Sequence, residues 1–158
     1  LFYFTFTALN AEESLKSVGK FKDWESFILS QDGNKTCFAQ SIPLLRAPKK
    51  FVRDPSRLFI SFRPKENIKN EISVTSGYEF KAKGTVTAKS GKKTYDLFSK
   101  GKFAWLVDDE DEAKLIKTMK KASRLMITGN TSKGNQTTDH YSMMGFTKAY
   151  NTTKKNCS

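Results

Sequence analysis

The sequence predicts a β-sandwich of antiparallel strands with one or two short helices. Apolar residues alternate with polar ones in most segments, glycine-containing turns recur at short intervals, and one segment has a helical period. With 158 residues the chain is long enough for one core and short for two. We therefore expect a single domain over residues 12–158.

The first eleven residues allow two interpretations. Phe2, Phe4 and Phe6 alternate with other side chains, which is typical of a strand. The same stretch is also like the apolar end of a secretory signal peptide that stops at Ala11. We prefer a signal remnant at residues 1–11, which predicts export, and keep the strand as the alternative.

Two consecutive apolar segments in "RLFISFRPKENIKNEISVTS" predict an antiparallel hairpin. The expected register sets Ile60 opposite Val74 and Arg63 opposite Glu71. A cross-strand pair of opposite charges stabilises a sheet by only about 0.2 to 1 kcal/mol. We therefore interpret Glu71 as a structural residue rather than a catalytic carboxylate.

A second hairpin is predicted in "GTVTAKSGKKTYDLF". Val86 should face Leu97 and Ala88 should face Tyr95, around a turn at Ser90 and Gly91. This arrangement places three lysines at or near the loop tip: Lys89, Lys92 and Lys93.

One segment, "VDDEDEAKLIKTMKKAS", predicts a helix. Ala113, Ile116 and Met119 form its apolar stripe, with acidic residues in the first turn and lysines in the last. The final segment, "FTKAYNTTKKNC", is expected to be a helix or an irregular tail.

The stretch "TDHYSMMGF" places four residues with hydrolase chemistry side by side, Asp139 to Ser142. If Ile127 lies opposite Tyr141, Asp139 shares the inward face of Tyr141, whereas His140 and Ser142 face the other way. A catalytic triad needs its three groups in one hydrogen-bonded line. Only His140 and Ser142 remain as candidates, without a Gly-x-Ser-x-Gly elbow.

Other catalytic classes lack a motif in this sequence. There is no Walker loop and no dinucleotide-binding glycine fingerprint. The "DDEDE" run is typical of the first turn of a helix. We expect a non-enzymatic protein with no catalytic residue, cofactor or metal site.

The net charge of +12 favours anionic partners, although a lysine-rich composition also follows from biased base composition. We expect weak contacts with anionic lipid or lipopolysaccharide through the hairpin-tip lysines and through Lys154 and Lys155. Nucleic acid is a second candidate partner. Its sequence-specific recognition is not expected, because the basic residues are not interleaved with aromatic ones on a strand.

Cys37 and Cys157 are the two cysteines of the chain. In an oxidising compartment they would form a disulfide, whereas in the cytosol they would be two buried thiols.

Several sequence blocks occur in an order that resembles a known family. They are "DWESFILS", "KTCFAQSIP", "FISFRPKENIKNEISVTSGYEF" and the long stretch from "FAWLVDD" to "GFTKAY". Together they resemble the invasion-associated locus B proteins of alphaproteobacteria over nearly everything after Ala11. The matching residues include Arg63, Pro64, Glu71, Ser73, Gly77, Tyr78, Trp105, Asp139, Tyr141, Ser142, Gly145 and Phe146.

The resemblance implies an exported envelope protein with an immunoglobulin-like β-sandwich, a signal peptide and a disulfide corresponding to Cys37 and Cys157. It links the chain to host-cell invasion and brings no catalytic mechanism. The chain departs from some members by lacking a second cysteine soon after Trp24, and His140 stands where the family carries a small polar residue.

These observations leave three functions in order of preference. The first is an exported periplasmic or outer-envelope accessory protein that binds an envelope component or a host surface. The second is a basic nucleic-acid-binding protein, and the third is a hydrolase that uses His140 and Ser142. No stretch of the sequence is apolar enough to span a membrane.

Overall fold

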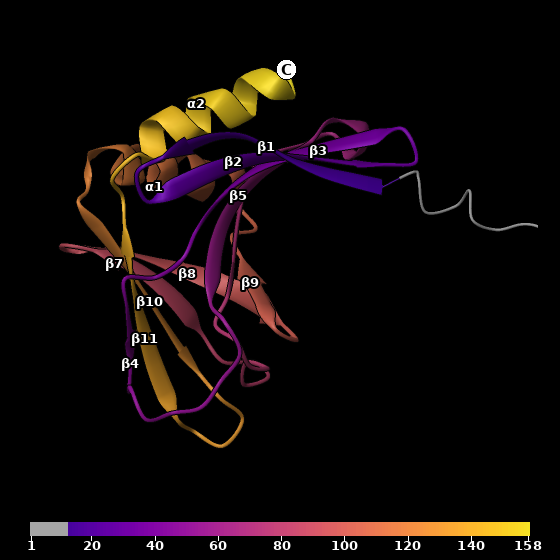
Figure 1. Ribbon diagram of the computed structural model, residues 1–158. Coiled ribbons are helices and arrows are strands. Elements are labelled where there is room, and N and C mark those ends of the chain that lie inside the picture. Colours follow the sequence, from indigo (N-terminus) through magenta and orange to yellow (C-terminus); the bar gives the residue numbers. More distant parts are fainter. Residues whose placement is uncertain (1–12) are drawn as a thin grey trace, which may run out of the picture.

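The computed structural model describes residues 13–158, so the predicted signal remnant lies outside the described part of the chain. This part contains eleven strands, two α-helices and one 3-10 turn (Figure 1). Their bounds are β1 Glu13–Phe21, β2 Trp24–Gln31, β3 Asn34–Ser41, β4 Leu45–Ala47, β5 Arg57–Arg63, η2 Pro64–Glu66, β6 Ile68–Thr75, β7 Val86–Ser90, β8 Lys93–Lys100, β9 Phe103–Trp105, α1 Asp109–Lys121, β10 Arg124–Asn130, β11 Gln136–Ser142 and α2 Phe146–Asn156.

The strands form one antiparallel, open sheet in the order β1-β2-β3-β5-β6-β9-β8-β7-β10-β11-β4. The two halves are joined because β8 pairs with β7 on one side and with β9 on the other. In Figure 1 the sheet bends, so that β1, β2 and β3 lie above β7, β8 and β10. The predicted mainly β fold is confirmed, whereas two separate sheets of an immunoglobulin-like sandwich are not shown.

The register of the β7–β8 hairpin is confirmed, with Val86 opposite Leu97 and Ala88 opposite Tyr95. The positive φ of Gly91, +58°, suits its turn position, because glycine adopts the left-handed region without a steric penalty.

The other two predicted registers are wrong by two residues. Ile60 pairs with Ile72 rather than Val74, and Ile127 pairs with Asp139 rather than Tyr141. A shift of two keeps every side chain on its face, so the alternation of apolar residues cannot distinguish the alternatives.

Helix α1 begins where Asp108 caps it: its side chain accepts hydrogen bonds from Glu110 N at 2.7 Å and Asp111 N at 3.3 Å. The expected apolar stripe is partly wrong. Ile116 and Met119 are buried, but Ala113 is exposed, and Leu115 is buried beside them.

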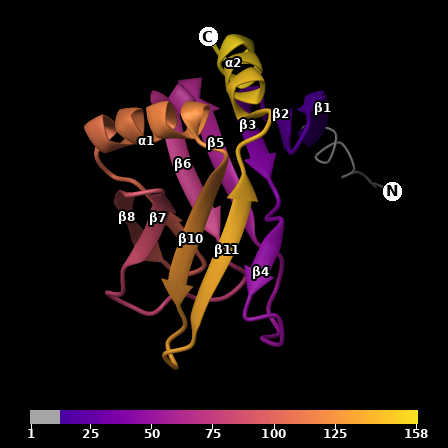
Figure 2. The same ribbon diagram turned by 90° about the vertical axis from the view of Figure 1, so that its left-hand side faces the viewer.

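The last segment is a helix, α2, which packs on β2 and β3 (Figures 1 and 2). Phe146 starts it and contacts Trp24 edge-on, with ring centroids 5.0 Å apart. The disulfide between Cys37 of β3 and Cys157, just after α2, is confirmed, with Cα atoms 6.0 Å apart. Neither α1 nor α2 is long and apolar enough to cross a bilayer.

Candidate anion-binding site

Lysines from two elements meet around a cavity of about 600 Å³ between the β7–β8 hairpin and α1. Figure 2 shows α1 next to this hairpin. We call this cavity the lysine pocket. Its lining residues are Ser90, Lys92, Lys93, Tyr95, Lys114, Lys117, Thr118, Lys121 and Ala122, a set that contains five lysines and no carboxylate.

Local geometry explains why the lysines face one another. Lys92 and Lys93 follow Gly91 in the tight turn that ends β7. Lys114, Lys117 and Lys121 are spaced three and four residues apart, which places them on one face of α1. One of these lysines already forms an ion pair, since Lys114 Nζ lies 3.4 Å from Glu110 Oε1 on the same helix.

A hydrogen bond joins the two elements that line the lysine pocket. The hydroxyl groups of Tyr95 in β8 and Thr118 in α1 lie 2.8 Å apart, and Tyr95 also donates to Lys114 O at 3.4 Å. The Tyr95 ring, Ala122 and the lysine methylene groups add apolar surface. The pocket can therefore hold a ligand that combines negative charge with a less polar body.

The predicted basic residues divide into two groups. Lys92 and Lys93 line the lysine pocket, whereas Lys89 is exposed outside it. Lys154 lines a different cavity of about 230 Å³ next to Cys157, and Lys155 is exposed. The prediction did not include the α1 lysines in a binding site, because it assigned the lysines of the last helical turn only to interactions with the helix dipole. Their spacing of three and four residues could have indicated that they share one face.

Asp139 lies in a buried ion pair with Arg53. Arg53 Nη1 donates to Asp139 Oδ2 at 3.0 Å and Nη2 to Oδ1 at 2.6 Å, and the two side chains are 1% and 0% exposed. Arg53 Nη1 also donates to Ser76 O at 2.9 Å. Because both side chains are closed to solvent, this pair offers no surface to a substrate, and loss of one partner would leave a buried charge uncompensated.

Two tyrosines lie close to this ion pair. Burial raises the pKa of Tyr141 well above its usual value, and the Asp139 carboxylate raises it further. Burial also raises the pKa of Tyr78, whose hydroxyl lies 2.7 Å from Thr137 Oγ1. Both rings therefore remain neutral at physiological pH.

No hydrogen bond joins His140 to Ser142 in the part of the chain that the structure describes. As predicted, Asp139 faces inward and His140 faces the other way. Ser142 Oγ accepts a hydrogen bond from Met144 N at 3.0 Å, and the Ser142 carbonyl accepts one from Trp24 Nε1 at 2.9 Å. These contacts give Ser142 a structural role at the end of β11.

The remaining family-type residues also have structural positions. Arg63 lies opposite Ile68 rather than Glu71 as predicted, but its side chain still forms an ion pair with Glu71, at 2.7 Å, and a second with Glu66 at 3.1 Å. Pro64 begins η2, which follows Arg63 directly. Ser73 of β6 pairs with Trp105 of β9.

Two glycines are required by close backbone contacts. Gly77 has φ +85°, and a Cβ there would lie 1.9 Å from Asp54 O. Gly145 has φ +90°, and a Cβ there would lie 1.8 Å from Phe21 O. Only glycine fits such positions.

A buried carboxyl group, Glu112, lies where α1 meets β6. It is 6% exposed and accepts a hydrogen bond from Ile72 N at 3.2 Å. Burial raises its pKa to about 7, and the Asp109 and Glu71 carboxylates add to the effect. No cluster of three or more potential metal ligands occurs among residues 13–158.

Comparison with known families finds a match over most of the chain. The family model described as "Invasion associated locus B (IalB) protein" matches residues 24–154. No curated protein and no solved structure matches the chain.

Proposed function

The chain belongs to the Invasion associated locus B (IalB) family, and from this premise we propose that it is an exported, non-enzymatic accessory protein of the cell envelope that associates with anionic surfaces such as lipid or lipopolysaccharide. The observation that carries the proposal is the convergence of five lysines on one pocket with no lining carboxylate. A host surface with similar anionic chemistry would serve equally as a partner.

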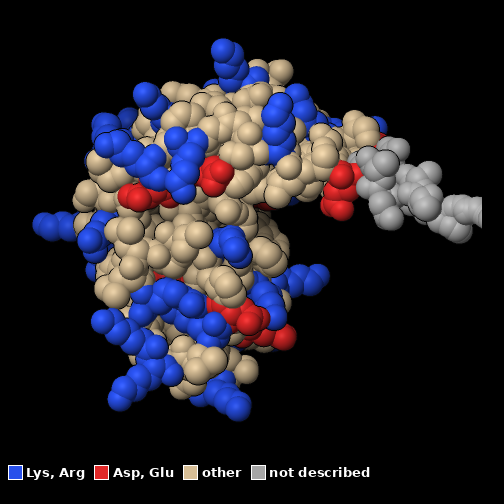
Figure 3. Space-filling model, in the orientation of Figure 1, with Lys and Arg blue, Asp and Glu red and all other residues tan. Residues whose placement is uncertain are grey.

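The charge distribution supports a weak and broadly distributed attraction. Figure 3 shows lysine and arginine side chains spread over the visible face, with acidic side chains in a few places between them. Lysines that remain solvated act as point charges and lack the forked geometry with which arginine fixes a phosphate. The attraction therefore draws the protein to a negatively charged surface without recognising a particular arrangement of its charges.

The Cys37–Cys157 disulfide supports export over the cytoplasmic nucleic-acid-binding alternative. Disulfides form and persist in oxidising compartments such as the periplasm and are rare in the cytosol. Periplasmic or outer-membrane-associated localisation is therefore part of the proposal.

Flotation of the purified protein with phosphatidylglycerol vesicles tests the surface association. We expect binding at low salt that falls steeply as salt rises, because the screening length shortens to about 8 Å at physiological ionic strength. Reversing Lys89, Lys92 and Lys93 to Glu should weaken binding without unfolding the domain. Neutral phosphatidylcholine vesicles are the control, and binding that ignores both salt and charge reversal would contradict the proposal.

A further inference from the structure

We infer that the lysine pocket is a discrete site for an anion that carries two or more phosphate groups. The inference rests on the proposed function, since it assigns a ligand class to one part of the same basic surface. It goes further in one respect: attraction spread over a surface has no fixed stoichiometry, whereas a site of this kind binds one ligand per protein.

The charge in the pocket exceeds what one phosphate group can neutralise. Five lysine side chains line it, and among residues 13–158 only Lys114 of these five has a carboxylate within ion-pair distance, that of Glu110. A phosphate monoester carries a charge of about −1.5 to −2 at neutral pH. Two or more phosphate groups are therefore needed to match the charge of the other four lysines.

The length of the lysine row leads to the same ligand class. Lys114, Lys117 and Lys121 follow one face of α1, and seven residues of helix span about 10 Å. A single phosphate contacts one end of this row. A ligand with successive phosphate groups can contact the whole row. The turn lysines, Lys92 and Lys93, would contact the same ligand from the opposite side of the pocket.

The hydrogen bond between Tyr95 and Thr118 fixes the relative position of the two elements that form the lysine pocket. It joins β8 to α1 at 2.8 Å and so holds the helical lysine row at a fixed distance from the hairpin turn. Fixing the two elements that carry the lysines before binding reduces the conformational freedom that is lost when a ligand arrives, which favours affinity. Tyr95 is therefore a positioning residue for the site.

Calorimetric titration with inorganic tripolyphosphate and with orthophosphate, at physiological salt, tests the site. We expect one tripolyphosphate per protein, bound at least about tenfold more tightly than orthophosphate. The double variant Lys117→Gln, Lys121→Gln should lose at least about tenfold in affinity. These side chains are exposed, so the fold should persist, which circular dichroism checks.

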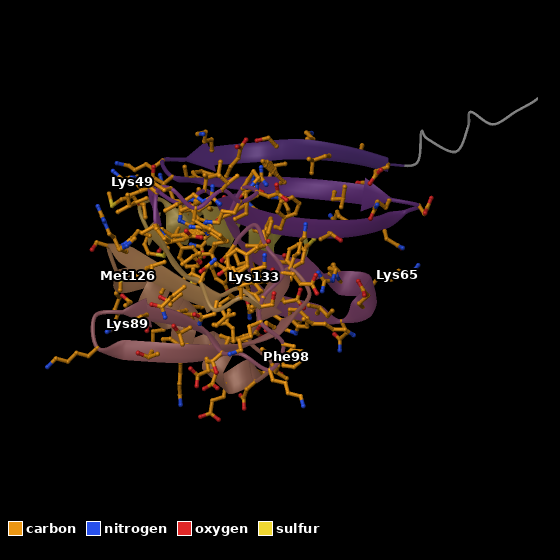
Figure 4. All side chains as sticks on the ribbon, turned by 90° about the horizontal axis from the view of Figure 1, so that it is seen from below. Lys49, Lys65, Lys89, Phe98, Met126 and Lys133 are labelled. Carbon is orange, nitrogen blue, oxygen red and sulfur yellow. A yellow bond between two sulfur atoms is a disulfide. The ribbon has the colours of Figure 1, made fainter. Side chains whose placement is uncertain are left out.

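A matched control removes the same charge elsewhere. Lys35 and Lys65 are exposed and outside the pocket, and Figure 4 shows Lys65 on the opposite side of the molecule from Lys89. The variant Lys35→Gln, Lys65→Gln should change affinity by less than about threefold, since distant surface charges are screened. Tyr95→Phe should weaken tripolyphosphate binding while leaving vesicle flotation unchanged, because it removes the hydrogen bond but no charge.

A second arm distinguishes a soluble ligand from a lipid headgroup. Vesicles of cardiolipin, which bears two phosphate groups, are compared with phosphatidylglycerol vesicles of equal phosphate content. A cardiolipin preference that the pocket variant loses and the control keeps assigns the ligand to the membrane. Pocket-dependent tripolyphosphate binding without that preference assigns it to a soluble polyphosphate.

The inference is overturned if tripolyphosphate does not bind, or if the pocket and control variants lose equal affinity. Vesicle flotation that still depends on salt would then leave the proposed function standing. Pocket-dependent tripolyphosphate binding without any flotation would instead remove the surface association and keep the site.

Discussion

The Arg53 guanidinium and the Asp139 carboxylate meet through two parallel hydrogen bonds, of 3.0 and 2.6 Å, inside the fold. The pair ties the loop before β5 to the middle of β11, 86 residues away. Breaking a buried pair by removing one partner is more costly than removing both, because the remaining charge stays uncompensated.

Asp139→Asn should therefore lower the free energy of unfolding by about 3 to 5 kcal/mol. The double variant Arg53→Met, Asp139→Leu should be less destabilised than Asp139→Asn, since it leaves no buried charge. Urea unfolding measures both, and Glu71→Gln, at a more exposed ion pair, is the control with an expected loss of about 1 kcal/mol or less. A double variant that is less stable than the single one would refute this interpretation.

Glu112 predicts a specific pH dependence. Its pKa is raised from 4.5 to about 7 in the fold, so the folded state binds this proton more tightly than the unfolded state. Its contribution to stability is therefore most favourable at low pH and is lost as pH rises through about 7.

Glu112→Gln removes the charge and keeps an acceptor for Ile72 N. We expect it to stabilise the protein by about 1 to 3 kcal/mol at pH 8.5 and to have little effect at pH 5, measured by urea unfolding. Glu110→Gln, at an exposed position of the same helix, is the matched control. An equal effect of Glu112→Gln at both pH values would contradict the assignment.

The Cys37–Cys157 disulfide encloses most of the chain, with a sequence separation of 120 residues. Cys157→Ser should lower the free energy of unfolding by about 2 to 5 kcal/mol, the usual range for a native bridge in a small domain. Intact mass before and after reduction should differ by two hydrogens. Equal masses that both match free thiols would rule the bridge out.

Substitutions at the former hydrolase candidates should leave vesicle binding unchanged. His140→Ala should alter stability little, because it is a partly exposed strand residue. Ser142→Ala should cost about 1 kcal/mol, because Met144 N loses its acceptor. A hydrolase screen that found turnover abolished by both substitutions would overturn the structural interpretation.

Sequence periodicity was sufficient for features that depend on which way a side chain faces. It placed Asp139 and Tyr141 on the inner face and paired Val86 with Leu97, because alternation and a two-residue turn define these relationships. It failed at the β5–β6 and β10–β11 registers, because the observed pairings differ from the predicted ones by two residues and leave the side chains on the same faces.

Contacts between distant segments were beyond the reach of local patterns. Nothing near Arg53 in the sequence indicates its partner, although an inward-facing Asp139 already required a cation. The lysine pocket likewise depends on how α1 sits beside the β7–β8 hairpin, which only the three-dimensional structure provides.

Fractionation of cells that produce the protein tests the central claim most directly. We predict that it sediments with the envelope at low salt, with Cys37 and Cys157 protected from thiol labelling, and that raised salt releases it. Recovery in the cytosolic fraction with both cysteines open to labelling, or retention on the envelope at every salt concentration, would contradict the account.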